Sequence, residues 1–242
     1  MERRSFFKIC AKGTLLVAIS PFLIEGYLKA DDGRLFKSFN RVKLLDCYGN
    51  PLKEEILQEE VTYVFNYPYA STPCFLIKLS EPAAKEIKLR DEEGSEYIWK
   101  GGVGKDKKVV AYSAICPHQL AHPNPNESFL GYIPKEKKSM AYKEGGVIVC
   151  ASHLSAFDPK TGAKVLAGPA KEPMASIILD VDEEGVFWAS AVLGPAKFFD
   201  YFKSFKPELK EFYKNIRKAK KLVSLGAVVK PLDVYSKEVV IY

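Results

Sequence analysis

Short runs of apolar residues, four to eight residues long, recur along the middle of the chain and are separated by turn-forming residues. β-Branched and aromatic side chains are frequent in these runs, which favours strands over helices. We predict strands at 61–66, 74–79, 96–99, 109–115, 147–150, 175–182 and 186–190. The turn sequence Asp182-Glu-Glu-Gly185 between the last two predicts an antiparallel hairpin. The pattern therefore predicts an all-β domain.

The pattern changes after Gly194-Pro195, where lysine and aromatic residues become frequent. Residues 207–223 have helical periodicity, with a proline at the start, Gly226 beyond the end, and apolar positions at Leu209, Phe212, Tyr213 and Ile216. Residues 203–221 contain eight basic and two acidic side chains. We predict a basic amphipathic helix that lies on an anionic membrane surface, packs on a partner subunit, or docks on its own domain with its lysines in solvent. The tail at 239–242 can add an edge strand.

The N-terminus carries Arg3-Arg4 followed by an apolar stretch at 9–24 that only Lys12 and Gly13 interrupt. This pattern is typical of a twin-arginine export signal. The stretch is short for a spanning helix, which needs about 20 apolar residues, and Leu28-Lys-Ala30 is a poor cleavage site. We predict that the segment is retained as a membrane anchor on the periplasmic side of the cytoplasmic membrane.

These patterns divide the chain into a signal or anchor at 1–30, a β domain at 31–195 and a basic helical extension at 196–242. The net charge is +6, and the five basic and two acidic residues at 1–30 leave +3 for the remainder. Nucleic-acid binding has no support, because the chain has no readout motif and no basic surface spread over the domain. The run Gly101-Gly-Val-Gly104 lacks the strand–helix context of a nucleotide-binding loop.

Two short motifs carry the candidate chemistry. Cys116-Pro-His118 is followed, 34 positions later, by Cys150-Ala-Ser-His153, so that each motif supplies one thiolate and one imidazole. Two Cys and two His on two loops suit a Rieske-type [2Fe–2S] cluster, in which the Cys hold one iron and the His hold the other. The expected function is electron transfer, with Cys116, His118, Cys150 and His153 as the cluster ligands.

Two other kinds of metal site fit these motifs less well. A structural Cys₂His₂ zinc site usually pairs Cys with Cys and His with His along the chain, unlike the order found here. A mononuclear iron of the oxygenase kind needs two further His and a carboxylate, whereas the chain has only three His in all. The third, His122, is interpreted as a loop residue. The chain is expected to transfer electrons without oxygenating a substrate.

The residues between the two motifs hold three prolines and several lysines at 123–146, with little apolar periodicity. We predict a long loop that shields the cluster, contacts a partner or is a passive insertion.

The chain resembles the Rieske iron–sulfur proteins of respiratory complexes. The resemblance rests on the apolar strand before Cys116, on Ser155 and Phe157 after the second motif, and on Gly168-Pro169-Ala170, which is similar to the proline loop that covers the cluster in that family. It implies an antiparallel β-sandwich with a small cluster-binding subdomain. Short blocks at 65–68, 71–74, 78–79 and 101–104 are most similar to the small subunit of arsenite oxidase.

The sequence departs from the family pattern in its sulfur chemistry. Ala121 and Ala151 stand where most members have the Cys of a disulfide between the loops, so this disulfide is expected to be missing. Cys47 and Cys74 are interpreted as small buried side chains, and a disulfide between them in an oxidising compartment is the alternative. Ser155 retains a hydroxyl, but Phe157 replaces a Tyr that donates a hydrogen bond to a ligand sulfur, which predicts a lower reduction potential than in quinol-oxidising members.

The resemblance implies an electron-transfer subunit of an exported respiratory oxidoreductase, with a large catalytic subunit or a cytochrome b as partner and a cytochrome c as electron acceptor. An arsenite-oxidase-like molybdenum enzyme is the first hypothesis, and a cytochrome bc complex is the second. In quinol-oxidising members an apolar Leu and a small Gly follow the first His, whereas Gln119 and Leu120 stand here. A zinc-stabilised binding module is the alternative of another class.

Overall fold

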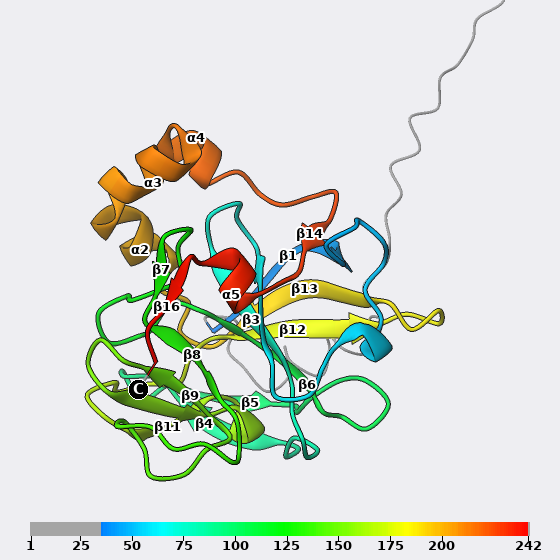
Figure 1. The fold of residues 1–242 in the computed structure, drawn as a ribbon, viewed down its shortest axis with the longest axis vertical. Helices are drawn as coiled ribbons and strands as arrows, with labels where there is room; N and C mark the ends of the chain where they lie inside the picture. The colour runs from blue at the N-terminus through cyan, green and yellow to red at the C-terminus, as the bar shows by residue number, and fades with distance from the viewer. Residues whose placement is uncertain (1–34, 242) are drawn as a thin grey trace, which may run out of the picture.

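The computed structural model describes residues 35–241, so the predicted signal or anchor at 1–30 lies outside the described residues. Most of the regular structure is β (Figure 1). The strands are β1 (Phe36–Leu45), β2 (Thr62–Asn66), β3 (Pro73–Lys78), β4 (Ile87–Arg90), β5 (Glu96–Trp99), β6 (Val109–Ser113), β7 (Glu127–Ser128), β8 (Leu130–Ile133), β9 (Val147–Cys150), β10 (Ser155–Asp158), β11 (Lys164–Ala167), β12 (Ser176–Val181), β13 (Phe187–Leu193), β14 (Ala227–Val228), β15 (Lys230–Pro231) and β16 (Glu238–Val239). The helices are α2 (Phe198–Ser204), α3 (Lys206–Tyr213), α4 (Ile216–Ala219) and α5 (Leu232–Tyr235), with 3₁₀ turns η1 (Glu54–Ile56) and η2 (Pro159–Thr161).

The largest sheet has eight strands in the order β14-β1-β13-β12-β6-β3-β2-β15. Its two end strands belong to one continuous segment, 227–231, which pairs in parallel with β1 and antiparallel with β2. This segment therefore bridges the two ends of the sheet and closes it into a barrel. The prediction of a mostly β fold is confirmed, and the closure makes the large sheet more barrel-like than an open sandwich.

Both faces of this sheet are buried, because side chains alternate between two cores. Along β3, Cys74 and Leu76 belong to the inner core, whereas Phe75 and Ile77 belong to the outer one. The inner core includes residues from most of the strands and is covered at one end by α2 and α3. The outer core packs against a smaller four-stranded sheet, ordered β11-β10-β9-β8, and contains both Cys116 and Cys150. The candidate site therefore lies between the two sheets.

The predicted strands are found within a few residues of their expected ends, and those at 96–99 and 147–150 match β5 and β9. The predicted hairpin is β12–β13, whose turn is fixed by the Asp182 carboxylate accepting from the Val186 amide at 2.8 Å and the Trp188 indole at 2.7 Å.

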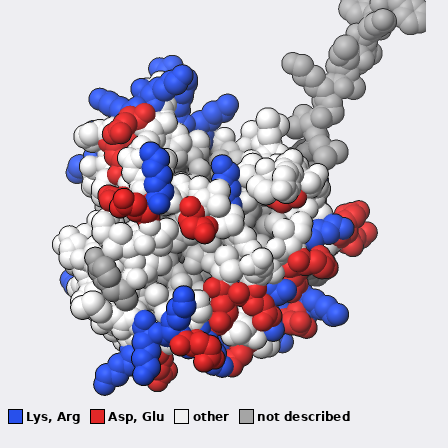
Figure 2. Space-filling view, viewed as in Figure 1, with Lys and Arg blue, Asp and Glu red and all other residues white. Residues whose placement is uncertain are grey.

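The single helix predicted at 207–223 is wrong, because the structure has the two shorter helices α3 and α4 there. Lys214 between them has φ 68°, and the Asn215 side chain accepts from the Lys218 amide at 2.9 Å. Asn215 thus caps a new helix instead of continuing the old one. The predicted basic surface is found: Lys and Arg side chains gather over α3 and α4 (Figure 2).

Residues 123–146 are not one long loop, because they contain β7 and β8. β8 is short and includes Gly131, so its own sequence does not indicate a strand. Its backbone is held in the extended conformation by pairing with β9. The tail forms β16, which pairs with β7 one residue before the predicted position. No helix in residues 35–241 is long and apolar enough to cross a membrane.

The two-sided burial of the large sheet can be tested with a matched pair of Phe variants. Phe75 in β3 is fully buried, whereas Phe199 in α2 is 65% exposed. Phe75→Ala is expected to lower the free energy of unfolding by about 3–5 kcal/mol, and Phe199→Ala by less than about 1 kcal/mol. Urea unfolding measures both, and equal losses would contradict the assignment of Phe75 to the core.

Candidate metal centre

The first ligand loop begins directly after β6 and is closed by its own backbone. The Leu120 amide donates to the Cys116 carbonyl at 2.9 Å, and the Cys116 amide donates to the Ala121 carbonyl at 2.9 Å. Leu120 takes the left-handed conformation, with φ 63°, that closes this turn. Before the turn, the Ala114 amide donates to the Pro73 carbonyl at 2.8 Å, so the loop starts from a fixed point on β3.

The second ligand loop connects β9 to β10. Cys150 is the last residue of β9 and pairs with Leu130 on one side and Ser155 on the other. The turn between them exposes Ser152, His153 and Leu154, and its start is held by the Ala151 amide, which donates to the Phe129 carbonyl at 2.7 Å. β8, which the sequence did not predict, therefore helps to position this loop.

The two predicted ligand cysteines lie against each other in the core, each 1% exposed. The hydrogen bond from the Cys116 thiol, opposed by burial, lowers the pKa of Cys150 to about 7, and the same contact together with burial raises the pKa of Cys116. Backbone amides also donate to the sulfurs, from His118 and Gln119 to Cys116 and from Ser152 and His153 to Cys150. Sulfurs that accept several amide hydrogen bonds suit metal-bound thiolates, whose negative charge such bonds stabilise.

The two predicted ligand histidines, His118 and His153, form a second pair on the solvent side. Their ring centroids are 4.9 Å apart at an interplanar angle of 83°. His118 is half-buried and His153 is exposed. His118 Nδ1 is buried and has no hydrogen-bond partner among the described residues, which is the state expected of a nitrogen kept for a metal.

The four side chains therefore form two pairs, a buried Cys pair and a solvent-facing His pair. In the described part of the chain, no three His, Cys, Asp or Glu side chains lie close enough together to hold a single metal ion. The donor set fits a two-iron cluster, in which each iron takes one pair of ligands. Cys116 and Cys150 would hold one iron, and His118 and His153 the other.

The segment predicted to cover the cluster lies directly against the second loop. Gly168 has φ 86°, and an added Cβ would lie 2.4 Å from the Leu154 carbonyl oxygen and 2.5 Å from Ser155 Cα. The Ala170 amide donates to Ser155 Oγ at 3.3 Å. Pro169 between them is exposed. Only glycine allows this close approach at residue 168.

Ser155 and Phe157 both point into the interior from β10. Ser155 is fully buried, and its Oγ already accepts from Ala170, so its own hydrogen is left to donate. Phe157 is fully buried in the outer core and has no polar atom to offer a sulfur. Sequence reasoning missed Ser152, whose hydroxyl also hydrogen-bonds Cys150. Its place beside a ligand His is the signal that could have identified it.

The remaining cysteines do not behave alike. Cys74 is fully buried, as predicted, and its thiol lies 3.0 Å from the Tyr67 carbonyl oxygen. Cys47 lies in the turn after β1 and is exposed. The prediction that it is a buried side chain is therefore wrong. Both are free thiols. Ala121 and Ala151, the expected positions of the missing disulfide, bond to the loops through backbone atoms alone.

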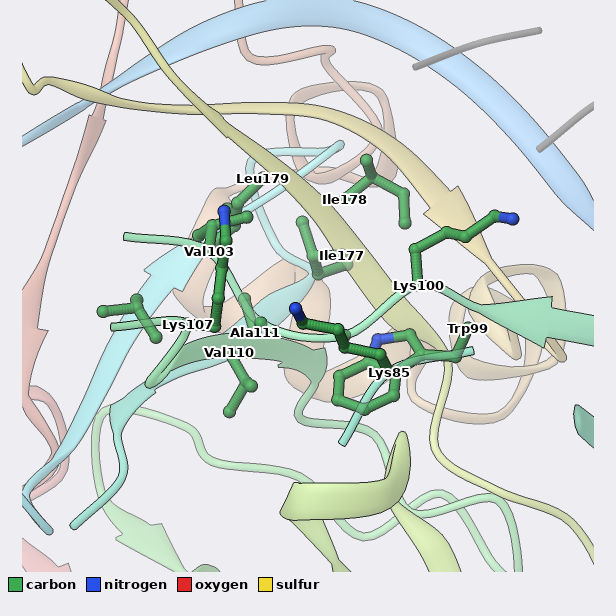
Figure 3. Close-up of a pocket in the computed structure, with 13 residues that line it drawn as sticks. Lys85, Trp99, Lys100, Val103, Lys107, Val110, Ala111, Ile177, Ile178 and Leu179 are labelled. Carbon is green, nitrogen blue, oxygen red and sulfur yellow. The ribbon is translucent and has the colours of Figure 1, made fainter. Parts of the chain in front are cut away.

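A separate hollow of about 200 Å³ lies where β6 and β12 diverge (Figure 3). These strands share only the pair Ser176–Tyr112. The apolar floor includes Val110 and Ile177, and Lys85, Lys100 and Lys107 stand around it. None of the four predicted ligands lines it, so the hollow is a seam in the barrel and not part of the metal centre.

The close approach of the covering segment can be tested with two glycine variants. Gly168 and Gly185 both have positive φ, but an added Cβ meets nothing within 4 Å at Gly185. Both Ala variants should lose about 1–2 kcal/mol of stability from backbone strain. Gly168→Ala should in addition displace the covering segment and accelerate loss of the cluster's visible absorbance, whereas Gly185→Ala should not. Equal rates of loss would contradict the role of Gly168.

Comparison with known proteins agrees with this geometry. The sequence model of the Rieske [2Fe–2S] domain matches residues 78–178, which include all four predicted ligands. A protein of Haloferax mediterranei, named as a respiratory nitrate reductase Rieske subunit, is 27% identical over 204 residues, covering 78% of this chain and 77% of that protein. The iodate reductase subunit IdrB of Pseudomonas sp. (strain SCT) is 28% identical over 215 residues, covering 86% of this chain and 87% of that protein.

Among solved structures, the soluble domain of Rieske protein II from Sulfolobus acidocaldarius is 24% identical, with a TM-score of 0.45, and the match covers 65% of this chain and 82% of that domain. The residues that the domain model matches include both loops that carry the Cys and His pairs. Residues 78–178 of this chain form a Rieske domain, and its cofactor is a Rieske-type [2Fe–2S] cluster.

Proposed function

We propose that this chain is the electron-transfer subunit of a respiratory oxidoreductase. The observation that carries the proposal is the separation of the ligand pairs, with Cys116 and Cys150 in the core and His153 in solvent. When bound, a cluster of this type accepts and releases single electrons at potentials of about −150 to +300 mV. The exposed His edge is the side from which a redox partner can reach it, and the buried thiolates exclude water from the other side.

Several exposed side chains beside His153 carry no charge. They are Gln119, Ser152, Leu154 and Pro169, and none of these four is acidic or basic. A partner that contacts these four side chains removes no charge of theirs from water, so their desolvation costs little free energy. This arrangement suits repeated association and dissociation, or a stable subunit contact made through apolar and amide groups.

The electron-transfer proposal is tested by EPR spectroscopy of the dithionite-reduced protein. A rhombic Rieske-type signal is expected in the wild type and in Gln119→Ala, which alters an exposed residue of the same loop. His118→Ala and His153→Ala should each abolish it, because one iron loses half of its protein ligands. A colourless, zinc-containing and EPR-silent wild type would overturn the proposal in favour of a zinc-stabilised binding module.

The partner we propose is a large molybdenum-containing catalytic subunit of the arsenite-oxidase type, with a cytochrome c as acceptor or donor. The two relatives are named as subunits of nitrate and iodate reductases, which supports a partner that converts an inorganic oxyanion. The blocks most similar to arsenite oxidase lie in the sheet framework, where Ser71 and Cys74 are buried. This likeness concerns the scaffold, so the partner has to be identified directly.

A cytochrome bc role is the second candidate, but the residues after the first ligand His favour it less. The Gln119 side chain is an exposed amide, and Leu120 is half-buried. An amide placed in an apolar quinol pocket would lose its hydrogen bonds with water, which costs free energy unless the pocket replaces them.

We also propose that the chain is exported through the twin-arginine route and held at the periplasmic face of the membrane. An affinity-tagged chain expressed in its native host should be found in the membrane fraction and should co-purify with a molybdopterin-containing subunit. The double variant Arg3→Lys, Arg4→Lys should stay in the cytoplasm, whereas Lys12→Arg should be exported normally. Co-purification with a cytochrome b would instead favour the quinol-oxidising role, and unchanged export of the double variant would contradict the export route.

A further inference from the structure

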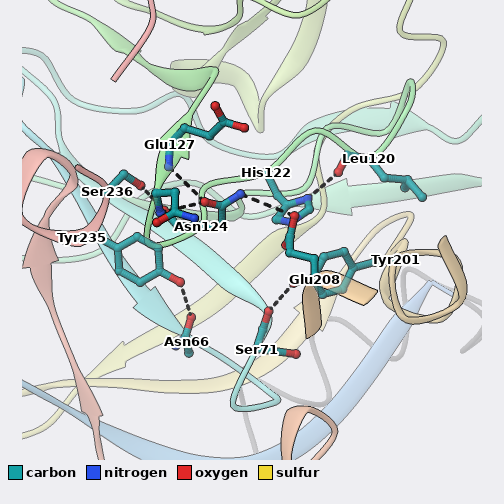
Figure 4. Close-up of polar contacts among 11 residues, drawn as sticks. Asn66, Ser71, Leu120, His122, Asn124, Glu127, Tyr201, Glu208, Tyr235 and Ser236 are labelled. Atoms are coloured by element: carbon teal, nitrogen blue, oxygen red, sulfur yellow. Dashed lines mark hydrogen bonds and ion pairs between the residues drawn. The ribbon is translucent and has the colours of Figure 1, made fainter. Parts of the chain in front are cut away.

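His122, the third histidine, is a buried side chain of a specific network. The residue is 7% exposed, and its ring lies beside that of Tyr201 (Figure 4). The ring packs edge-on against Tyr201 and Phe205, with 4.6 Å between ring centroids in each case. These two aromatic residues belong to α2 and to the junction between α2 and α3. His122 comes directly after Ala121, whose carbonyl closes the first ligand loop. The ring therefore joins the end of that loop to the C-terminal helices.

Both ring nitrogens are used. Nδ1 lies 2.7 Å from the Leu120 carbonyl oxygen, and Nε2 lies 2.7 Å from Glu208 Oε1 on α3. A carbonyl oxygen can only accept, so Nδ1 carries a hydrogen. The contact between Nε2 and Oε1 then needs a second proton, held by the ring as an imidazolium or by Glu208 as a carboxylic acid. The other oxygen, Oε2, accepts from Asn124 Nδ2 at 3.4 Å.

The C-terminal extension also holds the residues that follow His122. Ser236 Oγ donates to the Asn124 carbonyl at 2.7 Å, and the Glu238 amide donates to the Asn126 carbonyl at 3.0 Å. In the middle of α2, the Tyr201 hydroxyl donates to the Ser71 carbonyl at 2.9 Å. The extension therefore grips the exit of the first ligand loop from two sides, with α3 on one and the tail on the other.

No covalent link replaces this grip within the described residues. Cys116 and Cys150 are the only cysteines of the two ligand loops, and both face the cluster site. The position of His118 consequently depends on hydrogen bonds at both ends of a six-residue turn, 116–121. Because a buried polar group that loses its partner is costly, the His122–Glu208 contact has a strong preference for one geometry.

We propose that His122 is a positioning residue for the cluster, which fixes the first ligand loop to α3 through Glu208, so that the extension at 196–242 serves as a noncovalent brace of the metal centre. The proposal rests on the [2Fe–2S] site described above. It gives the extension a role in cluster retention in place of, or in addition to, contact with a partner.

The experiment compares three variants on α3. Glu208→Ala removes the contact to His122. Glu208→Gln keeps a hydrogen-bonding group, because its amide can donate to Nε2 of a neutral ring. Glu211→Ala, three residues away and exposed, is the matched control.

Two readouts are measured on the holoprotein, namely hydrogen–deuterium exchange of peptides covering 114–124 and the rate of loss of visible absorbance in mild urea. Glu208→Ala should increase both about tenfold relative to Glu211→Ala, which corresponds to about 1.4 kcal/mol. Glu208→Gln should restore most of the protection. The Glu208→Ala variant should also broaden or shift the EPR signal of the reduced cluster, which a general loss of stability would not do.

The proposal is overturned if Glu208→Ala and Glu211→Ala exchange and bleach at the same rate with the same EPR signal. If Glu208→Ala fails to fold while Glu208→Gln behaves as the wild type, the brace extends to the whole domain, and Asn124→Ala then tests it more mildly with the same readouts. If the wild type itself has no Rieske signal, the electron-transfer proposal fails. The exchange comparison on the cluster-free chain still decides whether Glu208 holds the loop.

Discussion

The contact between the Cys116 and Cys150 thiols, in the core between two sheets, is the constraint on which the rest of the site depends. One sulfur follows β6 of the barrel, and the other ends β9 of the small sheet. Both must reach the same point, so the two sheets have to pack in one register. The apolar side chains of the outer core, which surround both cysteines, maintain that packing. The metal centre is thus part of the core and not an addition to the surface.

The same arrangement explains why the cysteine side of the cluster site is held more firmly than the histidine side. The cysteines are reached through strands, whose positions are fixed by long ladders of hydrogen bonds. The histidines lie two and three residues further along, in turns that only a few backbone hydrogen bonds hold. The turns are less constrained than the strands. The covering segment at Gly168 contacts the second turn, and the contacts of His122 hold the end of the first turn. Further contacts restrict the backbone most at these turns, because few hydrogen bonds hold them.

The fold was predictable from sequence where strands are rich in β-branched and aromatic residues, as at β5 and β9, because local preference and burial agree there. β8 and β10 were not predicted, since Gly131 and the small residues Ser155 and Ala156 give no strong strand signal. The four predicted ligands could be proposed from sequence because their residue types are unusual at that spacing, and the structure places them in two pairs. The partner of His122 could not be predicted from sequence, because Glu208 lies 86 positions away and resembles any other helical glutamate.

Closure of the barrel by segment 227–231 has a consequence for the order of synthesis. The segment that joins β1 to β2 follows all the other strands of the large sheet in the chain, so until it is synthesised the sheet presents two unpaired edges. Open edges invite pairing with other chains, and short closing strands that carry Pro231 are poor templates for it once in place. The nascent β domain is therefore exposed to aggregation until segment 227–231 arrives and pairs with both end strands of the sheet.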